Sequence, residues 1–370
     1  MTITQLEIQL IASVVAAACA LPGVFLILRR MAMMSDAISH TVLLGIVLAF
    51  FVVEDINSPF LILGATITGV LTVSLVELLN RTRLVREDTA IGLVFPALFS
   101  LAVILISRYA GSVHLDSDAV LLGELAFAPF ERLIVAGRLD LGPISLWVMG
   151  GILLLNLLFI VLFYKELKLA TFDAALATTL GFSPALIHYG LMTLVSVTAV
   201  GAFDAVGSIL VVALMVGPPV TAYLLTDSLP RMLGLSVGIG VFSAVTGYWL
   251  AHYLDASIAG AMATMVGVWF LVVFFLAPRR GLVAQARRRA RQKWEFAQTA
   301  LAMHLYHHEG RPEAEEESRI DHLERHLRWS PEFAREVVSR AQQRGLVERQ
   351  NGHLALTDSG RNVAENALLS

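Results

Sequence analysis

Asp36 and His40 are the two residues of this 370-residue chain whose types and spacing suggest metal chemistry. They occur in MSDAISHTVLLGIVLAF, residues 33–49, a segment that is otherwise apolar enough to cross a membrane. Residues four positions apart on a helix share one face, and a carboxylate beside an imidazole suits a divalent first-row metal such as manganese, zinc or ferrous iron. An ionisable side chain inside a span costs about 2.5–3.5 kcal/mol on insertion scales and commonly marks the path of a solute. We therefore predict a metal-binding pair at the start of a transmembrane helix.

Two side chains do not complete the coordination shell of such a metal. The remaining ligands would be water, a backbone carbonyl, or an acid from another span, for which Glu77 and Asp204 are the candidates. The alternative is a structural role, in which Ser35 or Asp36 caps the helix and His40 donates to a backbone carbonyl. The cost of placing ionisable groups within the span favours the metal-binding interpretation.

The elements that would position this pair are membrane helices. The chain is 56% hydrophobic and only 15% charged, with a mean hydropathy of +0.72, which lies outside the range of soluble domains. The single cysteine, Cys19, lies in an apolar run, so a disulfide framework and a thiolate metal site are both excluded. The composition predicts an all-α polytopic membrane protein over residues 1–278.

About nine apolar stretches are long enough to cross a hydrocarbon core of about 30 Å as helices. Loops rich in arginine and lysine fall on one side if the spans alternate, and such loops stay in the cytoplasm. We therefore expect the N-terminus outside the cell and the C-terminus in the cytoplasm. The predicted spans cover residues 6–28, 35–53, 58–79, 89–107, 143–164, 184–203, 206–226, 231–252 and 257–276.

Two connecting segments carry further candidates. On the cytoplasmic side, YKELKLATFDAALATTLGFSP predicts a short helix from Thr171 to Leu180, ended by Gly181 and then Pro184. By its spacing alone, this helix fits a simple linker. On the outer side, a long loop carries groups that could receive a metal ion, although a solvated loop explains them equally well: His114, Asp116, Asp118 and Glu124.

The seventh predicted span contains the sequence GSILVVALMVGPP. Gly207, Ser208 and Gly217 permit close approach of another helix, and we favour a packing role for the glycines. Pro218 and Pro219 interrupt backbone hydrogen bonding, which fits either a static kink or a moving part of the pathway.

The composition changes abruptly after Pro278. An arginine-rich stretch, residues 279–292, suits the anionic inner leaflet and predicts a basic juxtamembrane linker. Residues 293–370 are polar enough to form a small cytoplasmic domain. The chain therefore divides into a transmembrane domain, a linker and a soluble domain.

The soluble domain carries start and stop signals for several elements. Ser330 and Pro331 predict the first residues of a helix, and Gly345 predicts its end. Asn351 and Gly352 predict a turn between two strands. The order helix, helix, helix, hairpin predicts a winged-helix domain of the α+β class.

Three segments carry a resemblance to one transporter family: LRRMAMMSDAISHTVLLGIVLAF, FDAALATTLGF and VGSILVVALMVGPPVTAYLL. They are similar to the manganese, zinc and iron permeases of the ATP-binding cassette importers, the ABC-3 family. The resemblance implies that Asp36 and His40 are metal ligands in the transport pathway. It also implies that Phe172, Asp173 and Gly181 belong to a coupling helix that contacts the ATPase subunit.

The resemblance further implies the partners of the chain. The sequence has no Gly-x-x-x-x-Gly-Lys-Ser/Thr loop for binding ATP phosphates, so we expect no enzyme activity, and no cofactor beyond the transported ion. The implied partners are a cytoplasmic ABC ATPase subunit, a second permease protomer in a homodimer or heterodimer, and an extracytoplasmic metal-binding protein. The implied location is the inner (plasma) membrane of a bacterium.

The tail carries a second resemblance, since HLRWSPEFAREVVSRAQQRGLV and LALTDSGRNVAE resemble the winged helix of diphtheria-toxin-repressor-type metalloregulators. That resemblance nominates Arg335, Arg340 and Arg344 for contact with DNA or a protein partner. DNA affinity depends mainly on neutralising phosphates, and acids nearly balance bases here, so we favour docking on the ATPase or permease over nucleic acid. Five histidines also suggest metal sensing, although histidines are common on solvated helices: His304, His307, His308, His322 and His326.

The function predicted from the sequence is therefore the permease subunit of an ABC importer for divalent transition metals. Manganese is placed ahead of zinc and iron because the regulator-like tail suggests manganese or iron circuits. The main alternative is a membrane-tethered, metal-responsive transcriptional regulator that binds DNA through its tail. A gradient-driven secondary transporter is a further alternative, which the coupling-helix resemblance disfavours.

Overall fold

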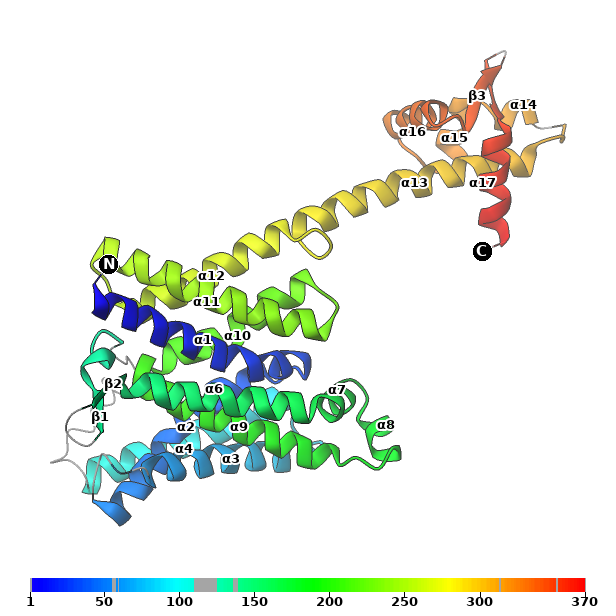
Figure 1. Cartoon of the computed structure of the whole chain (residues 1–370). Coiled ribbons are helices and arrows are strands. Elements are labelled where there is room, and N and C mark those ends of the chain that lie inside the picture. The colour runs from blue at the N-terminus through cyan, green and yellow to red at the C-terminus, as the bar shows by residue number, and fades with distance from the viewer. Residues whose placement is uncertain are drawn as a thin grey trace. The chain divides into compact units, whose positions relative to one another are not determined.

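The computed structural model describes residues 2–54, 58, 60–109, 125–135, 139–312, 314–350 and 352–369. The chain divides into two compact units, the membrane unit Met1–Arg280 and the C-terminal unit Gly281–Ser370. The membrane unit is a bundle of long apolar helices, and the C-terminal unit combines helices with two short strands (Figure 1).

Nine helices in the described part of the membrane unit are long and apolar enough to cross a bilayer, which confirms the expected polytopic architecture, although the unit is mostly helical rather than all-helical. Two shorter helices, α7 (Tyr164–Phe172) and α8 (Ala174–Thr179), lie between the fifth and sixth of them. The nine are α1 (Ile3–Leu28), α2 (Ala32–Val53), α3 (Phe60–Arg81), α4 (Glu87–Tyr109), α6 (Ile144–Leu162), α9 (Pro184–Val206), α10 (Ser208–Leu225), α11 (Leu229–Leu254) and α12 (Ile258–Leu276).

Helix α1 forms the buried centre of the membrane unit, where it packs against α6, α9, α10 and α11. Its run VVAAACA supplies small side chains, and small residues let membrane helices approach closely. The approach is closest at Gly23, where an added Cβ would lie 2.0 Å from the carbonyl oxygen of Met215 on α10. Gly23 is therefore required by the contact between α1 and α10.

Several buried polar side chains in the bundle form hydrogen bonds with neighbouring helices. The Asn156 side-chain amide on α6 donates to the carbonyl of Ala18 on α1 and to the Thr198 hydroxyl on α9, both at 2.9 Å. The Thr72 hydroxyl on α3 donates to the Thr41 hydroxyl on α2 at 2.8 Å. Since hydrocarbon offers no hydrogen bonds, such pairs are the way a membrane protein carries polar groups inside.

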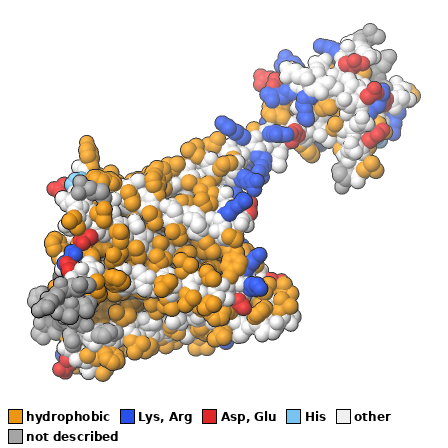
Figure 2. Space-filling view, in the orientation of Figure 1, with side chains coloured by type: hydrophobic (Ala, Val, Ile, Leu, Met, Phe, Trp, Pro, Cys, Tyr) orange, Lys and Arg blue, Asp and Glu red, His pale blue; other side chains and the backbone are white. Residues whose placement is uncertain are grey.

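The outer surface of the membrane unit is apolar. Leu154, Leu157 and Val161 on α6 are 48–69% exposed, and their spacing places them on one outward face of the helix. Figure 2 shows hydrophobic side chains covering the visible face of this unit, with Lys and Arg gathered at the end where α7 and α8 lie. An exposed surface of this kind is suited to contact with lipid.

A hairpin lies at the end of the bundle where α1 begins (Figure 1). A 3₁₀ turn η1 (Ala128–Phe130) precedes strands β1 (Arg132–Val135) and β2 (Leu139–Pro143), which pair antiparallel. Arg132 forms ion pairs with Asp140 on β2 and, at 3.2 Å, with Glu7 on α1. This hairpin belongs to the long outer loop of the sequence analysis, whose His114, Asp116, Asp118 and Glu124 lie outside the described residues.

The two prolines of α10 do not interrupt this helix, contrary to what their presence suggests. Helix α10 runs without interruption through Pro218 and Pro219, and the chain instead breaks before it at Gly207, which has φ of +77°. An added Cβ on Gly217 would lie 2.1 Å from Val266 Cγ1 on α12. The packing role expected for Gly217 is therefore confirmed, whereas the proline pair ends no helix.

The C-terminal unit is helical from Leu282 onward, so most of the stretch 279–292, expected as a linker, is part of one long helix. Ser330 accepts a hydrogen bond from the Phe333 amide at 3.4 Å, which confirms the predicted helix start. The elements are α13 (Leu282–His308), α14 (Ala314–Glu317), α15 (Ile320–His326), α16 (Pro331–Gln343), β3 (Val347–Gln350), β4 (His353–Leu356) and α17 (Asp358–Leu369).

The C-terminal unit has a hydrophobic core of its own, built from Leu301, Leu323, Val337 and Leu354 among others. Its two strands pair antiparallel around Gly352, which has φ of +87°, while Asn351 lies outside the described residues. These two short strands fit the predicted hairpin, but the winged-helix assignment stays a prediction.

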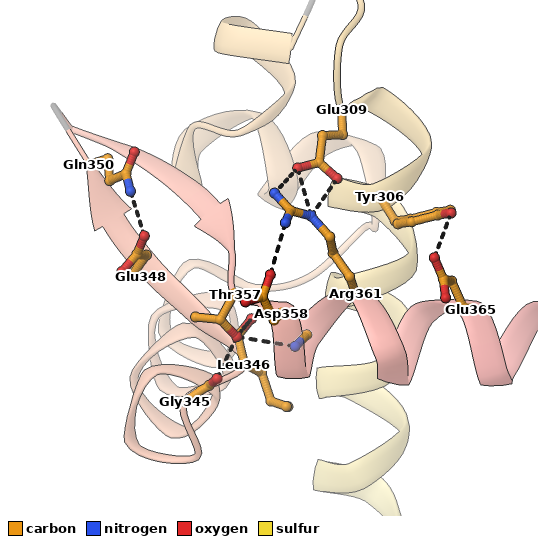
Figure 3. Close-up of polar contacts among 11 residues, drawn as sticks. Tyr306, Glu309, Gly345, Leu346, Glu348, Gln350, Thr357, Asp358, Arg361 and Glu365 are labelled. Atoms are coloured by element: carbon orange, nitrogen blue, oxygen red, sulfur yellow. Dashed lines mark hydrogen bonds and ion pairs between the residues drawn. The ribbon is translucent and has the colours of Figure 1, made fainter.

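Polar contacts fix α17 against the end of α13 (Figure 3). The Arg361 guanidinium contacts Glu309 at 2.7 Å and Asp358 at 3.1 Å, and the Tyr306 hydroxyl donates to Glu365 at 3.1 Å. The hydrogen bond to Glu365 also raises the pKa of the Tyr306 hydroxyl. Helix α17 thereby holds the last turn of α13 at two points.

We predict that Gly23→Ala destabilises the membrane unit and that Gly267→Ala does not. The added methyl group overlaps the Met215 backbone in the first variant, whereas no atom lies within 4 Å of a Cβ on Gly267. Overpacking of this kind costs about 1–3 kcal/mol, and alanine is otherwise the better helix former. Thermal unfolding of both variants in one detergent checks the difference, and equal midpoints would contradict the close approach at Gly23.

Candidate functional site

Asp36 and His40 lie in the first turns of α2 and share one face, as the spacing predicts. The distance between Asp36 Oδ1 and His40 Nε2 is 3.5 Å, and the two side chains are 40% and 26% exposed. Their neighbours Ser35 and Ser39 are buried. Two ligand atoms bound to one tetrahedral ion stand about 3.4 Å apart, so the pair is spaced to hold a single ion.

The structural alternative gave Ser35 or Asp36 a capping role at the start of α2. This part of the alternative is wrong. Met31 occupies the N-cap position of α2, and no side chain makes a capping hydrogen bond there. Ser35 instead donates to the carbonyl of Ala32 at 2.9 Å. Asp36 therefore has no capping role, and its carboxylate is free to act with His40.

Two aromatic rings of α4 position the imidazole. The His40 ring centroid lies 5.1 Å from that of Phe95 and 5.9 Å from that of Phe99. An apolar wall on this side limits the solvation of the site, and electrostatic attraction to a cation is stronger where water is excluded. Helix α2 thus carries the candidate pair, and α4 provides its apolar environment.

Glu77 and Asp204, the acids expected from other spans, do not lie close enough to bind a metal ion together with Asp36 and His40. Among the residues that the structure describes, no third histidine, cysteine, aspartate or glutamate forms a metal-binding group with Asp36 and His40. Glu77 is engaged by Arg81 at 2.6 Å, and Asp204 lies exposed near the end of α9. Within the described residues, the candidate site is therefore limited to the side chains of Asp36 and His40.

A polar cluster near the start of α2 connects the bundle to α7, and the sequence analysis missed it. Arg29, between α1 and α2, donates to the Thr171 hydroxyl of α7 at 3.1 Å and lies 3.4 Å from His188 Nδ1 on α9. Burial lowers the pKa of the Arg29 guanidinium to about 10. The sequence does show a basic residue, Arg29, directly after an apolar span. It does not show the partners of Arg29, because they lie about 140 to 160 positions away along the chain.

The segment between α6 and α9 forms two short helices rather than the single helix expected from Thr171 to Leu180. Helix α7 ends at Phe172, and the Asp173 side chain caps α8 by accepting a hydrogen bond from the Leu176 amide at 2.9 Å. Aspartate is a strong N-cap because its oxygen satisfies an orphan amide, so a new helix starts here. Gly181, with φ of +85°, ends α8 as predicted.

This segment presents an apolar surface. Phe172, Leu176 and Leu180 are 62%, 45% and 57% exposed. They lie at the end of the membrane unit where basic side chains gather (Figure 2). Exposed apolar residues rimmed by charge are typical of a surface that another protein covers.

The arginines nominated in the tail are largely engaged within the C-terminal unit. Arg340 contacts Glu336 at 2.6 Å and its guanidinium carbon lies 4.2 Å from the Trp294 ring centroid. Arg344 donates to Gln298 on α13 at 2.9 Å. Arg335 donates to the carbonyl of Pro331 at 3.1 Å and is exposed. These contacts give the DNA-binding alternative no support.

Comparison with protein families matches residues 4–277 to the ABC 3 transport family. The chain is 50% identical over 364 residues to the zinc transport system membrane protein TroD of Treponema pallidum (strain Nichols), covering 98% of both chains. It is 47% identical over 283 residues to the manganese transport system membrane protein MntD of Bacillus subtilis (strain 168), covering 76% of this chain and 95% of that protein.

A solved structure shares the architecture of the membrane unit. PsaBC from Streptococcus pneumoniae in complex with Fab matches with a TM-score of 0.63 and 29% identity, covering 76% of this chain and 94% of that one. The match with TroD extends over the C-terminal unit, since it leaves only a few residues of this chain uncovered. The family match ends before that unit begins.

We predict that Asp173→Ala loosens α8, whereas Asp173→Asn preserves it. Alanine removes the cap of the Leu176 amide, at a cost of about 0.5–2 kcal/mol, while asparagine caps equally well. Hydrogen exchange of a peptide covering α8 measures this directly, and exchange should speed up in the alanine variant alone. Equal exchange in both variants would show that Asp173 does not hold this helix.

Proposed function

Because the chain belongs to the ABC 3 transport family, we propose that it is the permease subunit of an ATP-driven importer of divalent transition metals. The observation that carries this proposal is the carboxylate–imidazole pair on α2, whose two side chains are 3.5 Å apart and partly exposed. The pair lies inside a helical bundle that the family matches over residues 4–277. Asp36 and His40 bind the ion in the pathway. ATP hydrolysis belongs to a separate subunit, since the chain has no phosphate-binding loop.

The pathway is completed by a second permease protomer. Two side-chain ligands are too few to hold a transition metal, and a symmetric partner would bring an equivalent pair to the same ion. A heterodimer with a similar pair serves equally. Ligands shared between two protomers can be pulled apart, so the ion is released when the protomers move, which a transport site requires.

The cargo is a divalent ion of the manganese, zinc and iron group. The ligand set of carboxylate and imidazole suits this group but does not favour one member strongly. Our preference for manganese rested on the tail, yet the relative that aligns along the tail is named a zinc transport protein. The relative matched over 76% of this chain is named a manganese transport protein. Zinc and manganese are therefore both tested below.

The α7–α8 segment is the contact with the ATPase subunit. Phe172 supplies an exposed aromatic anchor, Asp173 fixes the start of α8, and Gly181 ends it. The Arg29–Thr171 hydrogen bond ties this segment to the end of α1, so a displacement of α7 is passed into the bundle. The basic side chains at this end support a cytoplasmic position for it, with the N-terminus outside.

The remaining assignments follow from this function. The protein lies in the inner membrane of a bacterium and receives its ion from an extracytoplasmic metal-binding protein. The C-terminal unit is a cytoplasmic winged-helix-like domain that docks on the ATPase or the permease. Its two strands and its following helix α17 support that assignment.

We predict that Asp36→Ala and His40→Ala each lower ATP-dependent metal uptake about tenfold or more. Loss of outer-shell partners alone typically costs 10–100-fold in affinity or activity, and these residues are direct ligands. The assay uses proteoliposomes containing the permease, its ATPase and its binding protein, with radiolabelled zinc or manganese and the other ion as competitor.

His252→Ala is the matched control for His40→Ala, because His252 lies exposed at the end of α11. It should transport like the wild type. Undiminished uptake in both site variants would remove the pair from the pathway. Absence of ATP-dependent uptake of either ion, in a wild-type complex shown to be assembled, would contradict the permease function.

We further predict that Phe172→Asp weakens binding of the ATPase subunit. Aromatic anchors at protein interfaces commonly contribute about 2 kcal/mol or more, which corresponds to roughly 30-fold in affinity. Phe127→Asp is the matched control, because Phe127 is 60% exposed beside η1, at the opposite end of the bundle. Titration of detergent-solubilised permease with the ATPase measures both affinities, and equal losses would contradict the contact.

A further inference from the structure

Four histidines surround one glutamate in the C-terminal unit. Glu317 Oε2, at the end of α14, lies 3.4 Å from His304 Nε2, 3.1 Å from His322 Nε2 and 3.7 Å from His326 Nδ1. His308 adds a fourth imidazole, with its ring centroid 4.8 Å from that of His304. These groups come from α13, α14 and α15, and they lie outside the transport site described above.

The hydrogen-bonding needs of this cluster are not met by the protein. Glu317 Oε2 is buried and makes no hydrogen bond, although three imidazole nitrogens lie near it, and the side chain is only 12% exposed. His308 Nδ1 is also buried without a hydrogen-bond partner. Leaving a buried polar group unsatisfied costs about 1–3 kcal/mol, and more for a charged one. A bound cation would satisfy both groups at once.

The spacing of the atoms fits one small metal ion. Ligand atoms about 2.0–2.2 Å from a tetrahedral ion stand about 3.4 Å apart, and the three nitrogen-to-oxygen distances at Glu317 are 3.1–3.7 Å. Two groups of three ligands share Glu317, one with His304 and His308 and one with His322 and His326. Within each group all ligand atoms lie within 4.8 Å of one another.

His304 is the most deeply buried imidazole of the cluster, with its side chain only 7% exposed. An imidazole binds a metal ion through the lone pair of an unprotonated ring nitrogen. His304 Nε2 lies 3.2 Å from the Glu317 carbonyl, where its proton is donated in the metal-free protein. Coordination through Nε2 moves that proton to Nδ1 of the same ring.

The surroundings hold the ligands in place and leave a route to solvent. Contacts of Arg361 with Glu309, and of Tyr306 with Glu365, anchor the last turn of α13, which carries His308 (Figure 3). His304, His308 and His326 also line a pocket with a volume of about 730 Å³. An ion can therefore reach the site without unfolding it.

We propose that the C-terminal unit binds one divalent first-row transition ion, with zinc as the best match, at Glu317, and that its further ligands come from the two imidazole pairs that share this carboxylate, His304 with His308 and His322 with His326. Imidazole nitrogens and one carboxylate oxygen are the ligand set that zinc prefers. The bound ion joins α13, α14 and α15 through their side chains. This site lies in the C-terminal unit alone and is independent of the proposed transport function.

The test measures metal bound by the full chain in detergent, in an Asp36→Ala/His40→Ala background so that the transport pair contributes nothing. We expect one zinc ion per chain after loading and desalting, measured by mass spectrometry of the metal. Glu317→Gln, which preserves the shape of the side chain, should lower zinc affinity about tenfold or more. His322→Gln, on the partly exposed surface of α15, should do the same without disturbing the core.

His307→Ala is the matched control, because His307 lies on α13 between His304 and His308 but belongs to neither ligand group. It should keep the ion. Cobalt substitution gives a second readout, since the visible absorption of a four-coordinate site should disappear in Glu317→Gln and persist in His307→Ala. Unchanged zinc binding in Glu317→Gln and His322→Gln, with circular dichroism like that of the parent, would overturn the proposal.

Discussion

Polar groups inside a bilayer must find their partners within the protein, and this constraint organises the membrane unit. Asn156 meets it by donating to α1 and α9, and the Thr41–Thr72 pair meets it between α2 and α3. Asp36 and His40 differ from these pairs, since they lie 3.5 Å apart with part of each side chain exposed. A partly exposed carboxylate and imidazole within a membrane helix are the kind of groups that mark the path of a solute, which is why we propose them as the transport site.

The proposed coupling to an ATPase requires this bundle to be rigid at its centre and to move at one end. Close contacts such as Gly23 on the Met215 carbonyl leave α1 and α10 little freedom to slide, because any larger side chain would overlap the backbone. Directly after the C-terminal end of α1, Arg29 donates to the Thr171 hydroxyl of α7. A rigid centre of this kind transmits the displacement of a surface segment as a movement of whole helices rather than absorbing it.

The C-terminal unit shows the same constraint outside the membrane. Its core is complete without a metal, because leucines and valines from α13, α15, α16 and the hairpin pack together. The side chain of Glu317 is nevertheless buried against imidazoles and makes no hydrogen bond through Oε2. A buried carboxylate in that state costs folding energy, so its presence beside four histidines is better explained by a ligand than by stability.

The sequence by itself determined the features that depend on short stretches of chain. The length of the apolar stretches predicted the nine long helices that the described residues contain. Helical periodicity placed Asp36 and His40 on one face. Both predictions depend only on residues that are close together in the sequence. The break at Asp173 was missed although its signal was local, since a capping aspartate competes with a continuous helix and the outcome depends on packing. The tertiary structure alone brought His304 of α13 and Glu317 of α14 together with the histidines of α15. Contacts between helices depend on how the chain folds back on itself, and the spacing of residues along the sequence does not contain that information.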